Sequence, residues 1–520
     1  MILGIDFGTC FSHVSVIITD DVKEDFVVDS SGNSLIPSLY LSVDGRDYFG
    51  RDARDKGRLC GRTPIKELKT KVRGQEYNLK YPCGEGDNSQ TYGEILKKML
   101  GYILKLTNEN IEKKIPDSIE YITITAPVSL SEGGIQNTQY NSFLKNAIKE
   151  YTGLDDEHIF VKEEPVMAAY SYICNKKPNK NQKILVFDLG GGTLDTSIVN
   201  YDYSKDVMDV VGTSGKSIGG NDWTDALFKL IQTKAVDFVP KNYNYEPLRD
   251  NVENLKTILS TKDSGLIQIT LDDGSVKSIK VSRNEFEVIT SDLLKKCMEH
   301  LNNMMRKLGC KWDDIDKVVL VGGGSYMPQI TDMFLGYPGM SENKIYLHMP
   351  SLAISNGAVL FTKKNYKQSG GIEIGPYVEE IASHTYGVEV DNTYHNAPLI
   401  KNIIFRGDKY VGGKVYCSPD CTFQPASDTI NHVLHIKVYE SNCLRNECDD
   451  DGCINLIKDA IPVGKPIRIP IPKGYANKST KYKIRIAFIL TSDGILTVRV
   501  TEVGSGRILT EVNINNPVEE

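Results

Sequence analysis

The chain has 520 residues, of which 40% are hydrophobic and 25% are charged, and its formal net charge is −7. This balance is typical of a folded protein with about three or four compact units, and it excludes wholesale disorder. Acidic and basic residues are interleaved without a dense basic run, so we expect no nucleic-acid partner. The start has no charged leader, and no apolar segment approaches the roughly 20 residues of a membrane span, which predicts a cytoplasmic protein.

Two segments, Ile2–Ile18 and Ile184–Val199, share one sequence pattern and look like an internal repeat. In each, an apolar strand runs into an aspartate, Asp6 or Asp188, followed by a glycine-containing turn with a threonine and a second β-rich strand. This pattern predicts a β-hairpin in each segment. Because the two hairpins are alike, the sequence indicates an internal duplication with two lobes.

Helical and strand patterns alternate between and after the hairpins. In chain order they predict a helix at 95–106, a strand at 121–127, a helix at 140–151, helices at 223–238 and 286–308, and a strand from Lys317 into a glycine-rich turn at Gly322 that a helix follows. Strands that alternate with helices predict α/β lobes. Past Lys363 the chain becomes polar and glycine-containing, as in a linker, and period-two alternation then predicts an all-β module over roughly residues 380–520.

The two hairpin turns have the composition of a phosphate-binding site. Successive backbone N–H groups in a turn such as Gly190–Thr193 can hold a phosphate, and glycine lets the backbone approach it closely. Asp6, Asp188 and Asp195 lie on or beside the turns, where carboxylates would hold a hydrated Mg²⁺. Asp-x-Gly is also good turn chemistry, which explains either segment alone. Two similar hairpins together with the third turn at Gly322 favour a clamp on one nucleotide.

Other catalytic motifs fit less well. Residues 212–217, Gly-Thr-Ser-Gly-Lys-Ser, end like a P-loop, but the first glycine is too close to the second, so we interpret them as an ordinary turn. The His-Glu-x-x-His zinc helix does not occur.

The hairpins, the segment Glu163–Tyr170 and the turn at 321–328 together resemble the heat-shock 70-kDa chaperones, the DnaK-like family. The resemblance implies an α/β two-lobed actin-like ATPase domain with duplicated, ribonuclease-H-like lobes at residues 1–365. It further implies an interdomain linker at 366–380 and an all-β sandwich that binds peptide substrates at 381–520. Since the sequence ends at Glu520, just after the last strands, we expect a divergent member without the family's C-terminal helical lid.

The resemblance also implies the roles of individual residues. The catalytic set that it implies is Asp6, Lys69, Glu164, Asp188, Thr193 and Asp195. The nucleotide-binding set is Gly8, Thr9, Cys10, Gly190, Gly191, Gly192, Thr193, Gly219, Gly220, Glu253, Lys256, Ser260, Gly322, Gly323, Gly324 and Tyr326. Asp6 and Asp188 would hold Mg²⁺ through water, and Glu164 with Pro165 would couple the nucleotide state to the rest of the protein. For Lys69 an ordinary surface lysine is the alternative, because Lys66 and Lys71 lie nearby.

The chain departs from the family pattern around the nucleotide. Cys10 stands where the family has a second threonine, and Gly324, Tyr326 and Ser351 replace residues that are usually Ser, Arg and Asp. Thr257 stands where an arginine commonly packs on adenine. Tyr326 could stack on the base instead, so we expect nucleotide binding with altered contacts.

A cysteine-rich segment is the other unusual feature. Its chemistry-bearing residues are Cys417, Cys421, Cys443, Cys448 and Cys453, with His432 and His435 between them. They could form a Zn²⁺ site or disulfides, but the spacing fits no standard zinc finger and free thiols in loops are favoured. The acidic stretch 449–452 resembles part of a calcium loop, yet Lys458 stands where an EF-hand needs a glutamate, so a solvated acidic turn is the better interpretation.

The resemblance implies an ATP-dependent, stress-response chaperone that binds unfolded or extended peptides and uses slow ATP hydrolysis to gate its affinity for them. ATP or ADP and Mg²⁺ are the implied cofactors, with K⁺ as a further candidate. The implied partners are a J-domain co-chaperone and a nucleotide-exchange factor, and we expect a monomer that binds neither nucleic acid nor membrane. An alternative is an ATP-binding regulator or nucleotide-exchange partner of other chaperones with little hydrolysis, and a metabolite kinase is disfavoured by the β-module.

Overall fold

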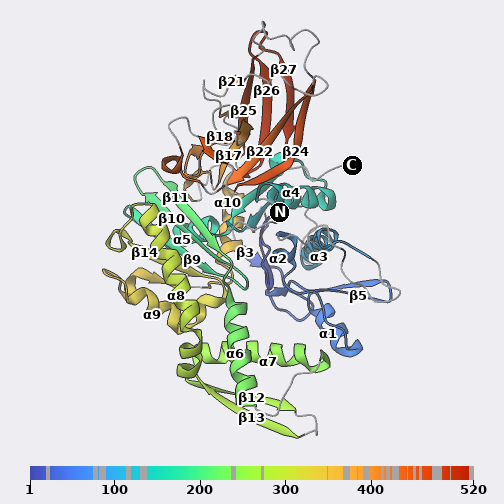
Figure 1. The fold of residues 1–520 in the computed structure, drawn as a ribbon. Helices are drawn as coiled ribbons and strands as arrows, with labels where there is room; N and C mark the ends of the chain where they lie inside the picture. The colour runs from blue at the N-terminus through green and yellow to red at the C-terminus, as the bar shows by residue number, and fades with distance from the viewer. Residues whose placement is uncertain are drawn as a thin grey trace.

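The computed structural model describes residues 1–18, 24–73, 80, 89–112, 119–128, 137–235, 242–270, 275–347, 349–366, 375–382, 384–390, 399–410, 415–416, 422–423, 433–441, 443–448, 453–455, 460–470, 483–491 and 493–514. Helices and strands alternate along the chain as far as α10, which ends at Asn365, and the rest is built of strands. Figure 1 shows the strand-rich C-terminal part, in orange and red, standing on the mixed α/β part.

The first sheet contains the first hairpin. Its strands are β3 (Glu24–Phe26), β2 (Phe11–Ile17), β1 (Ile2–Asp6), β7 (Tyr121–Ala126) and β8 (Ile159–Glu163) in spatial order, with β4 (Ile36–Pro37) paired to β2. β1 is antiparallel to β2 and parallel to β7, and β8 is parallel to β7. Residues of β1 are buried on both faces, as expected for a central strand covered by helices on each side.

The second sheet contains the second hairpin. Its strands are β15 (Ile345–Tyr346), β14 (Lys317–Val321), β9 (Gln182–Leu189), β10 (Leu194–Asp202), β11 (Val207–Lys216), β16 (Tyr377–Ile381) and β19 (Lys409–Tyr410). β14 is parallel to β9 and β15, whereas β9, β10 and β11 are antiparallel neighbours. The run β11-β10-β9-β14-β15 therefore has the same order and strand directions as β3-β2-β1-β7-β8.

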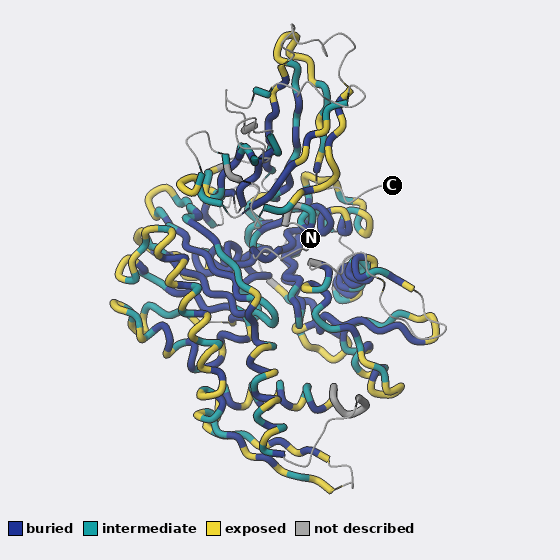
Figure 2. Tube along the Cα trace, in the orientation of Figure 1, coloured by how far each residue is buried: buried dark blue, intermediate teal, exposed yellow. Residues whose placement is uncertain are grey.

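Two helices lie between the sheets, α5 (Glu164–Lys176) and α10 (Ala353–Asn365). On α10, Val359 packs with Ile2 and Ile17 of the first sheet, whereas Ile354 and Ala358 belong to the cluster that covers the second sheet. The outer faces are covered by other helices, α3 (Tyr92–Glu112) and α4 (Asn137–Thr152) on the first sheet and α6 (Gly220–Lys234), α8 (Arg283–Lys307) and α9 (Pro328–Leu335) on the second. Figure 2 accordingly shows the centre of the α/β part as buried and its edges as exposed.

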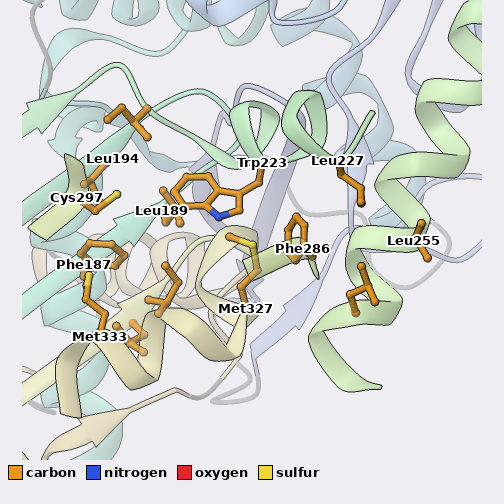
Figure 3. Close-up of a cluster of buried hydrophobic side chains, with 14 of the residues drawn as sticks. Phe187, Leu189, Leu194, Trp223, Leu227, Leu255, Phe286, Cys297, Met327 and Met333 are labelled. Carbon is orange, nitrogen blue, oxygen red and sulfur yellow. The ribbon is translucent and has the colours of Figure 1, made fainter. Parts of the chain in front are cut away.

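The largest core cluster surrounds Trp223, which is fully buried. Figure 3 shows its indole among Leu189 of β9, Phe286 of α8 and Met327, which precedes α9. The same cluster reaches Leu255 on α7 (Asn242–Thr261), and α7 packs on a peripheral hairpin of β12 (Ser264–Thr270) and β13 (Val276–Ser282). Apolar burial thus fixes α7 relative to β9, which carries Asp188.

Smaller elements complete the α/β part near the first sheet. They are β5 (Tyr40–Val43), β6 (Arg46–Phe49), α1 (Gly50–Cys60) and α2 (Leu68–Arg73). β5 and β6 form a hairpin whose turn places Asp44 and Gly45 at positive φ, a conformation that Asp and Gly tolerate better than most residues.

The strands β17, β18 and β20–β27 form what we call the β-module. One of its sheets contains β23 (Cys453–Asn455), β18 (Leu399–Ile404), β17 (Thr385–Val390), β22 (Val433–Ser441) and β24 (Ile461–Pro470). The other contains β20 (Val415–Tyr416), β25 (Ile484–Leu490), β26 (Leu496–Glu502) and β27 (Ile508–Asn513), with β21 (Thr422–Phe423) paired to β25. Alternate side chains of both sheets, such as Ile436, Ile467, Phe488 and Val498, share one hydrophobic core, so the two sheets are packed face to face.

Most elements expected from periodicity are present. The helices expected at 95–106, 140–151 and 286–308 correspond to α3, α4 and α8, and the helix expected at 223–238 is α6, whose helical residues end at Lys234. Both hairpins, the strand at 121–127 and the strand, turn and helix around Gly322 are confirmed. No helix of the described residues combines the length and apolar composition that a membrane span requires.

One prediction was wrong, and one segment has more structure than expected. Residues 212–216 are the end of strand β11 and pair with β10 from Lys216 to Gly212, so they are not a turn. The glycines misled the prediction because Gly212 lies within a strand and packs closely against Leu308, whose side chain would lie 2.6 Å from a Cβ there. Within the expected linker 366–380, residues 367–374 are outside the described part, whereas residues from Tyr377 onward form β16, parallel to β11.

The close packing of α10 against α5 gives a stability prediction. A Cβ at Gly357 would lie 1.8 Å from the carbonyl oxygen of Met167, which is backbone and cannot move aside cheaply. We expect Gly357→Ala to lower the free energy of unfolding by about 1–3 kcal/mol or more, as other overpacked cores do. Thermal melting of the two proteins measures this loss of stability. Gly504→Ala is the control, because nothing lies within 4 Å of a Cβ at that position. Equal melting temperatures for the two variants would contradict the prediction.

Candidate functional site

A cavity of about 670 Å³ lies where the turns of the two hairpins face each other. The first turn connects β1 to β2 and the second connects β9 to β10, while α7 and the third glycine-rich turn form other walls. The expected site residues that line the cavity are Asp6, Gly8, Thr9, Cys10, Lys69, Glu164, Asp188, Gly190, Gly191, Thr193, Gly220, Glu253, Lys256, Ser260, Gly322, Gly323, Gly324 and Tyr326. The fold therefore gathers residues from positions 6 to 326 into one site.

Glycine is required where the two turns meet. The N–H of Gly190 donates to the carbonyl of Thr193 at 2.9 Å, which closes the second turn. A Cβ at Gly191 would lie 2.4 Å from Cys10 Sγ, and a Cβ at Gly8 would lie 2.1 Å from the carbonyl oxygen of Phe11. A side chain at Gly8 would collide with the backbone of its own turn, and one at Gly191 would collide with Cys10 of the opposite turn, so the approach of the hairpins favours glycine at both positions.

Three expected residues, Gly192, Gly219 and Asp195, are not part of the cavity wall. Gly219 supports the second turn from behind, since a Cβ there would lie 2.4 Å from the carbonyl oxygen of Gly191. The Oδ1 atom of Asp195 accepts the backbone N–H of Val128 at 3.0 Å, which ties β10 to the segment that follows β7. In this structure Asp195 therefore joins the two sheets behind the site.

Lys69 is a buried residue, which rules out the alternative of an ordinary surface lysine. Its ammonium forms an ion pair with Glu164, and the two side chains are 4% and 6% exposed. Burial alone would lower the pKa of Lys69, but the combined attraction of Glu164, Tyr140 and Asp6 outweighs it and holds that pKa above its ordinary value. Lys69 is thus a fixed positive charge in the cavity wall.

The carboxylates beside Lys69 are difficult to ionise together. Burial, followed by repulsion from Glu164, raises the pKa of Asp6 from 3.8 to about 7. Burial and repulsion from Glu164 and Asp195 raise the pKa of Asp188 well above 3.8. Such shifts mark a site with more negative charge than Lys69 balances, and functional sites are where groups of this kind concentrate. Among the residues that the structure describes, no three His, Cys, Asp or Glu side chains converge closely enough to ligate a metal directly.

The far end of the cavity is formed by α7. Glu253, Lys256 and Ser260 all line it, as their spacing on one helix face predicts. Lys256 Nζ donates to the carbonyl of Gly220 at 2.9 Å and lies 2.8 Å from Thr224 Oγ1. Lys256 therefore also ties α7 to the start of α6, and burial lowers its pKa. Tyr326, opposite, remains 47% exposed, which leaves its ring available to a ligand.

Residues that the sequence analysis missed form polar contacts at the cavity wall, which Arg58, Asn221 and Asp250 line. Asp250 of α7 pairs with Arg58 of α1 at 3.4 Å and with Lys66 at 3.3 Å. Asn221 Nδ2 donates to Glu67 Oε1 at 2.5 Å. These contacts join parts of the chain that lie up to 192 residues apart. No local motif marks them, and the one signal in the sequence is the polar surface of α1 and α7.

The cysteine-rich segment is described only in part. Cys417, Cys421, His432 and the acidic stretch 449–452 lie outside the described residues. Cys443 and Cys448 are free thiols whose sulfur atoms are 3.3 Å apart, and Cys453 lies on β23. Within the described residues, no group of His, Cys, Asp and Glu side chains forms a metal site here.

Comparison with known proteins agrees with this geometry. The family profile described as "Hsp70 protein" matches residues 2–345. The chain is 26% identical over 523 residues to "Chaperone protein DnaK" of Thermosipho melanesiensis, covering 98% of this chain and 80% of that protein. It is likewise 26% identical over 541 residues to "Chaperone protein DnaK" of Thermosipho africanus, covering 100% of this chain and 82% of that protein. Because the profile spans more than half of the chain and both hairpins that form the cavity, the chain belongs to the Hsp70 family.

Proposed function

We propose that the protein is an ATP-dependent chaperone in which slow ATP hydrolysis controls the affinity of the β-module for unfolded or extended peptides. The observation that carries this proposal is the cavity between two Asp-Gly hairpins, which combines buried carboxylates, a buried lysine and glycine turns. These groups are what phosphoryl transfer to water requires, since it depends on positioning and charge stabilisation. Relatives named as DnaK chaperones match the chain beyond the cavity, into the β-module.

The residues of the cavity divide the work of hydrolysis. The N–H groups and hydroxyls of the two turns, with Thr9 and Thr193, hold the phosphates of ATP. Lys69 is held by Glu164 and provides positive charge at the γ-phosphate. Asp6 and Asp188 fit a hydrated Mg²⁺, because carboxylate oxygens are its preferred ligands and its charge would favour their ionised forms. Mg²⁺ would neutralise charge on the phosphates, and the same carboxylates would orient the attacking water.

The repeated sheet topology supports a duplicated, actin-like architecture for the ATPase part. We assign the ATPase domain to residues 1–365, with the ribonuclease-H-like lobes built on the two sheets. Residues 366–380 are the linker and residues 381–520 are the peptide-binding sandwich. In this assignment β16 is the end of the linker, bound as an added strand to β11 of the second lobe.

Contacts between the β-module and the first sheet support coupling between the two parts. Asp493, in the turn between β25 and β26, is 5% exposed and pairs with Lys145 of α4. Its Oδ1 atom accepts the N–H of Val161 on β8 at 2.9 Å, and its carbonyl accepts Asn141 Nδ2 at 2.9 Å. Glu164 follows this strand directly and holds Lys69 in the cavity. A change at the phosphates can therefore reach the β-module through β8.

The chaperone proposal predicts measurable turnover. We expect the purified chain to hydrolyse ATP slowly and to be stimulated several-fold by a J-domain protein together with an unfolded peptide. Release of peptide should quicken when ATP replaces ADP, as measured by fluorescence anisotropy of a labelled peptide. ATP binding without turnover, and peptide affinity that ignores the nucleotide, would instead support the regulator that hardly hydrolyses.

The site assignment predicts a loss of ATP turnover without a loss of stability. We expect Asp188→Asn to reduce ATP turnover by about 100-fold or more, as loss of one transition-state contact typically does. It should not lower the melting temperature of the nucleotide-free protein, because it removes a charge that burial and neighbouring carboxylates disfavour. The control is Asp263→Asn, whose side chain is 98% exposed. Turnover in Asp188→Asn that matches the control would refute the assignment.

The coupling contact predicts a variant that hydrolyses ATP without controlling the β-module. Asp493→Ala leaves Lys145 as a buried, unpaired charge, and breaking such a pair costs about 3–5 kcal/mol. We expect this variant to lose most of its ATP-dependent change in peptide release while its unstimulated turnover remains. Glu511→Ala, which removes an exposed pair with Arg499 in the same β-module, should behave like the unmodified chain. Intact nucleotide control of peptide release in Asp493→Ala would overturn this role.

A further inference from the structure

Two cysteine side chains meet in the β-module beside a short 3₁₀ helix, η6 (Arg445–Glu447). The sulfur atoms of Cys443 and Cys448 are 3.3 Å apart, and both residues are half-buried against Ile400 and Tyr439. A disulfide has its sulfur atoms about 2.05 Å apart, so a movement of roughly 1 Å would join them. The pair lies far along the chain from the cavity residues and has no role in the proposed hydrolysis.

The surroundings of the two sulfur atoms differ. Asn402 Nδ2 lies 3.3 Å from Cys448 Sγ and donates to it, and such a donor stabilises a thiolate. Cys443 Sγ lies 3.3 Å and Cys448 Sγ 3.6 Å from the carbonyl of Leu444, which can only accept a hydrogen bond, so the donor Asn402 is what distinguishes Cys448. Burial and the contact with Cys448 raise the pKa of Cys443 to about 12. Cys448 is therefore the better nucleophile of the pair.

We propose that Cys443 and Cys448 are a reversible oxidation site that hydroperoxides convert to a disulfide. The Cys448 thiolate attacks the terminal oxygen of the peroxide, the O–O bond breaks, and Cys448 becomes a sulfenic acid. The leaving oxygen takes up the proton that the Cys448 thiol gave to solvent and departs as water from hydrogen peroxide, or as an alcohol from an organic hydroperoxide. Cys443 then gives up its proton and attacks the sulfenic sulfur, which releases water and forms the S–S bond. The two sulfur atoms lose two electrons in total and the peroxide gains them, and a dithiol reductant reverses the change.

The structure connects this site to a contact between the β-module and the second sheet. Thr385 Oγ1 donates to the carbonyl of Cys443 at 2.6 Å and accepts the N–H of Arg406 at 2.8 Å. The guanidinium of Arg406 donates to the carbonyl of Thr213 on β11. Arg445 of η6 also pairs with Asp408, two residues after Arg406. Closing the disulfide restricts the η6 loop, so the hydrogen bonds that hold Arg406 should open less often.

The test is oxidation of the full chain with hydrogen peroxide, followed by alkylation and peptide mass spectrometry. We expect Cys443 and Cys448 to lose reactivity together and to regain it with dithiothreitol. Hydrogen exchange in residues 399–410 should slow on oxidation, because the Arg406 amide is one of those protected. Cys60→Ser is the control, since Cys60 is exposed and far from the pair, and it should oxidise at Cys443 and Cys448 like the unmodified chain.

Single variants separate the two roles. Cys443→Ser should accumulate a sulfenic acid at Cys448 that a dione reagent traps, whereas Cys448→Ser should leave Cys443 reduced. The disulfide proposal is overturned if both thiols still alkylate after peroxide, or if either one bridges to Cys453 or another cysteine. A sulfenic acid that forms first at Cys443 would overturn the assignment of the nucleophile. Unchanged exchange at 399–410 after the disulfide has formed would overturn its link to Arg406.

Discussion

The carboxylates buried around Lys69 are the constraint on which the rest of the structure depends. Asp6, Glu164, Asp188 and Asp195 are each less than one-tenth exposed, and Lys69 pairs directly with Glu164. Because the pKa of Asp6 is about 7 in the fold against 3.8 ordinarily, the folded protein keeps a proton that the unfolded chain releases between these pH values. The contribution of Asp6 to stability therefore falls as pH rises through this range. A fold that retains such a cluster is less stable than one without it, and in return it has a site that attracts cations.

The cluster stays in place because it stands on the ends of central strands. Asp6 ends β1 and Asp188 lies near the end of β9, and both strands are buried on each face. Glu164 begins α5, whose first turn carries Pro165 at a position where a missing N–H costs nothing. α5 and α10 fill the space between the two sheets so closely that Gly357 and Gly4 have no room for a Cβ. Local strand and helix signals and tight packing together hold the charges at fixed positions.

The sequence predicts what depends on local patterns and misses what depends on long-range pairing. Three predicted features depend only on residues close together in the sequence, and the structure contains each of them. They are the Asp-Gly turns, the alternating strands, and the helix face that carries Glu253, Lys256 and Ser260. The Asp250 ion pairs and the Asp493 contacts join residues up to 352 positions apart, and single charged residues carry no signal of such partners. Residues 212–216 were misassigned because a glycine that packs closely within a strand cannot be distinguished, from sequence alone, from a glycine in a turn.

The β-module is attached to both sheets of the α/β part, through different side chains. Asp493 binds Val161 in the middle of β8 in the first sheet, and Arg406 binds Thr213 on β11 in the second. The two contacts come from separate turns of the β-module, which its own core holds together. A rotation of one sheet relative to the other cannot preserve both contacts, because a rigid module cannot follow two bodies that move differently. Rotation of one sheet against the other and attachment of the β-module to both sheets are therefore opposed in this arrangement, and the weaker of the two contacts decides which sheet keeps the module.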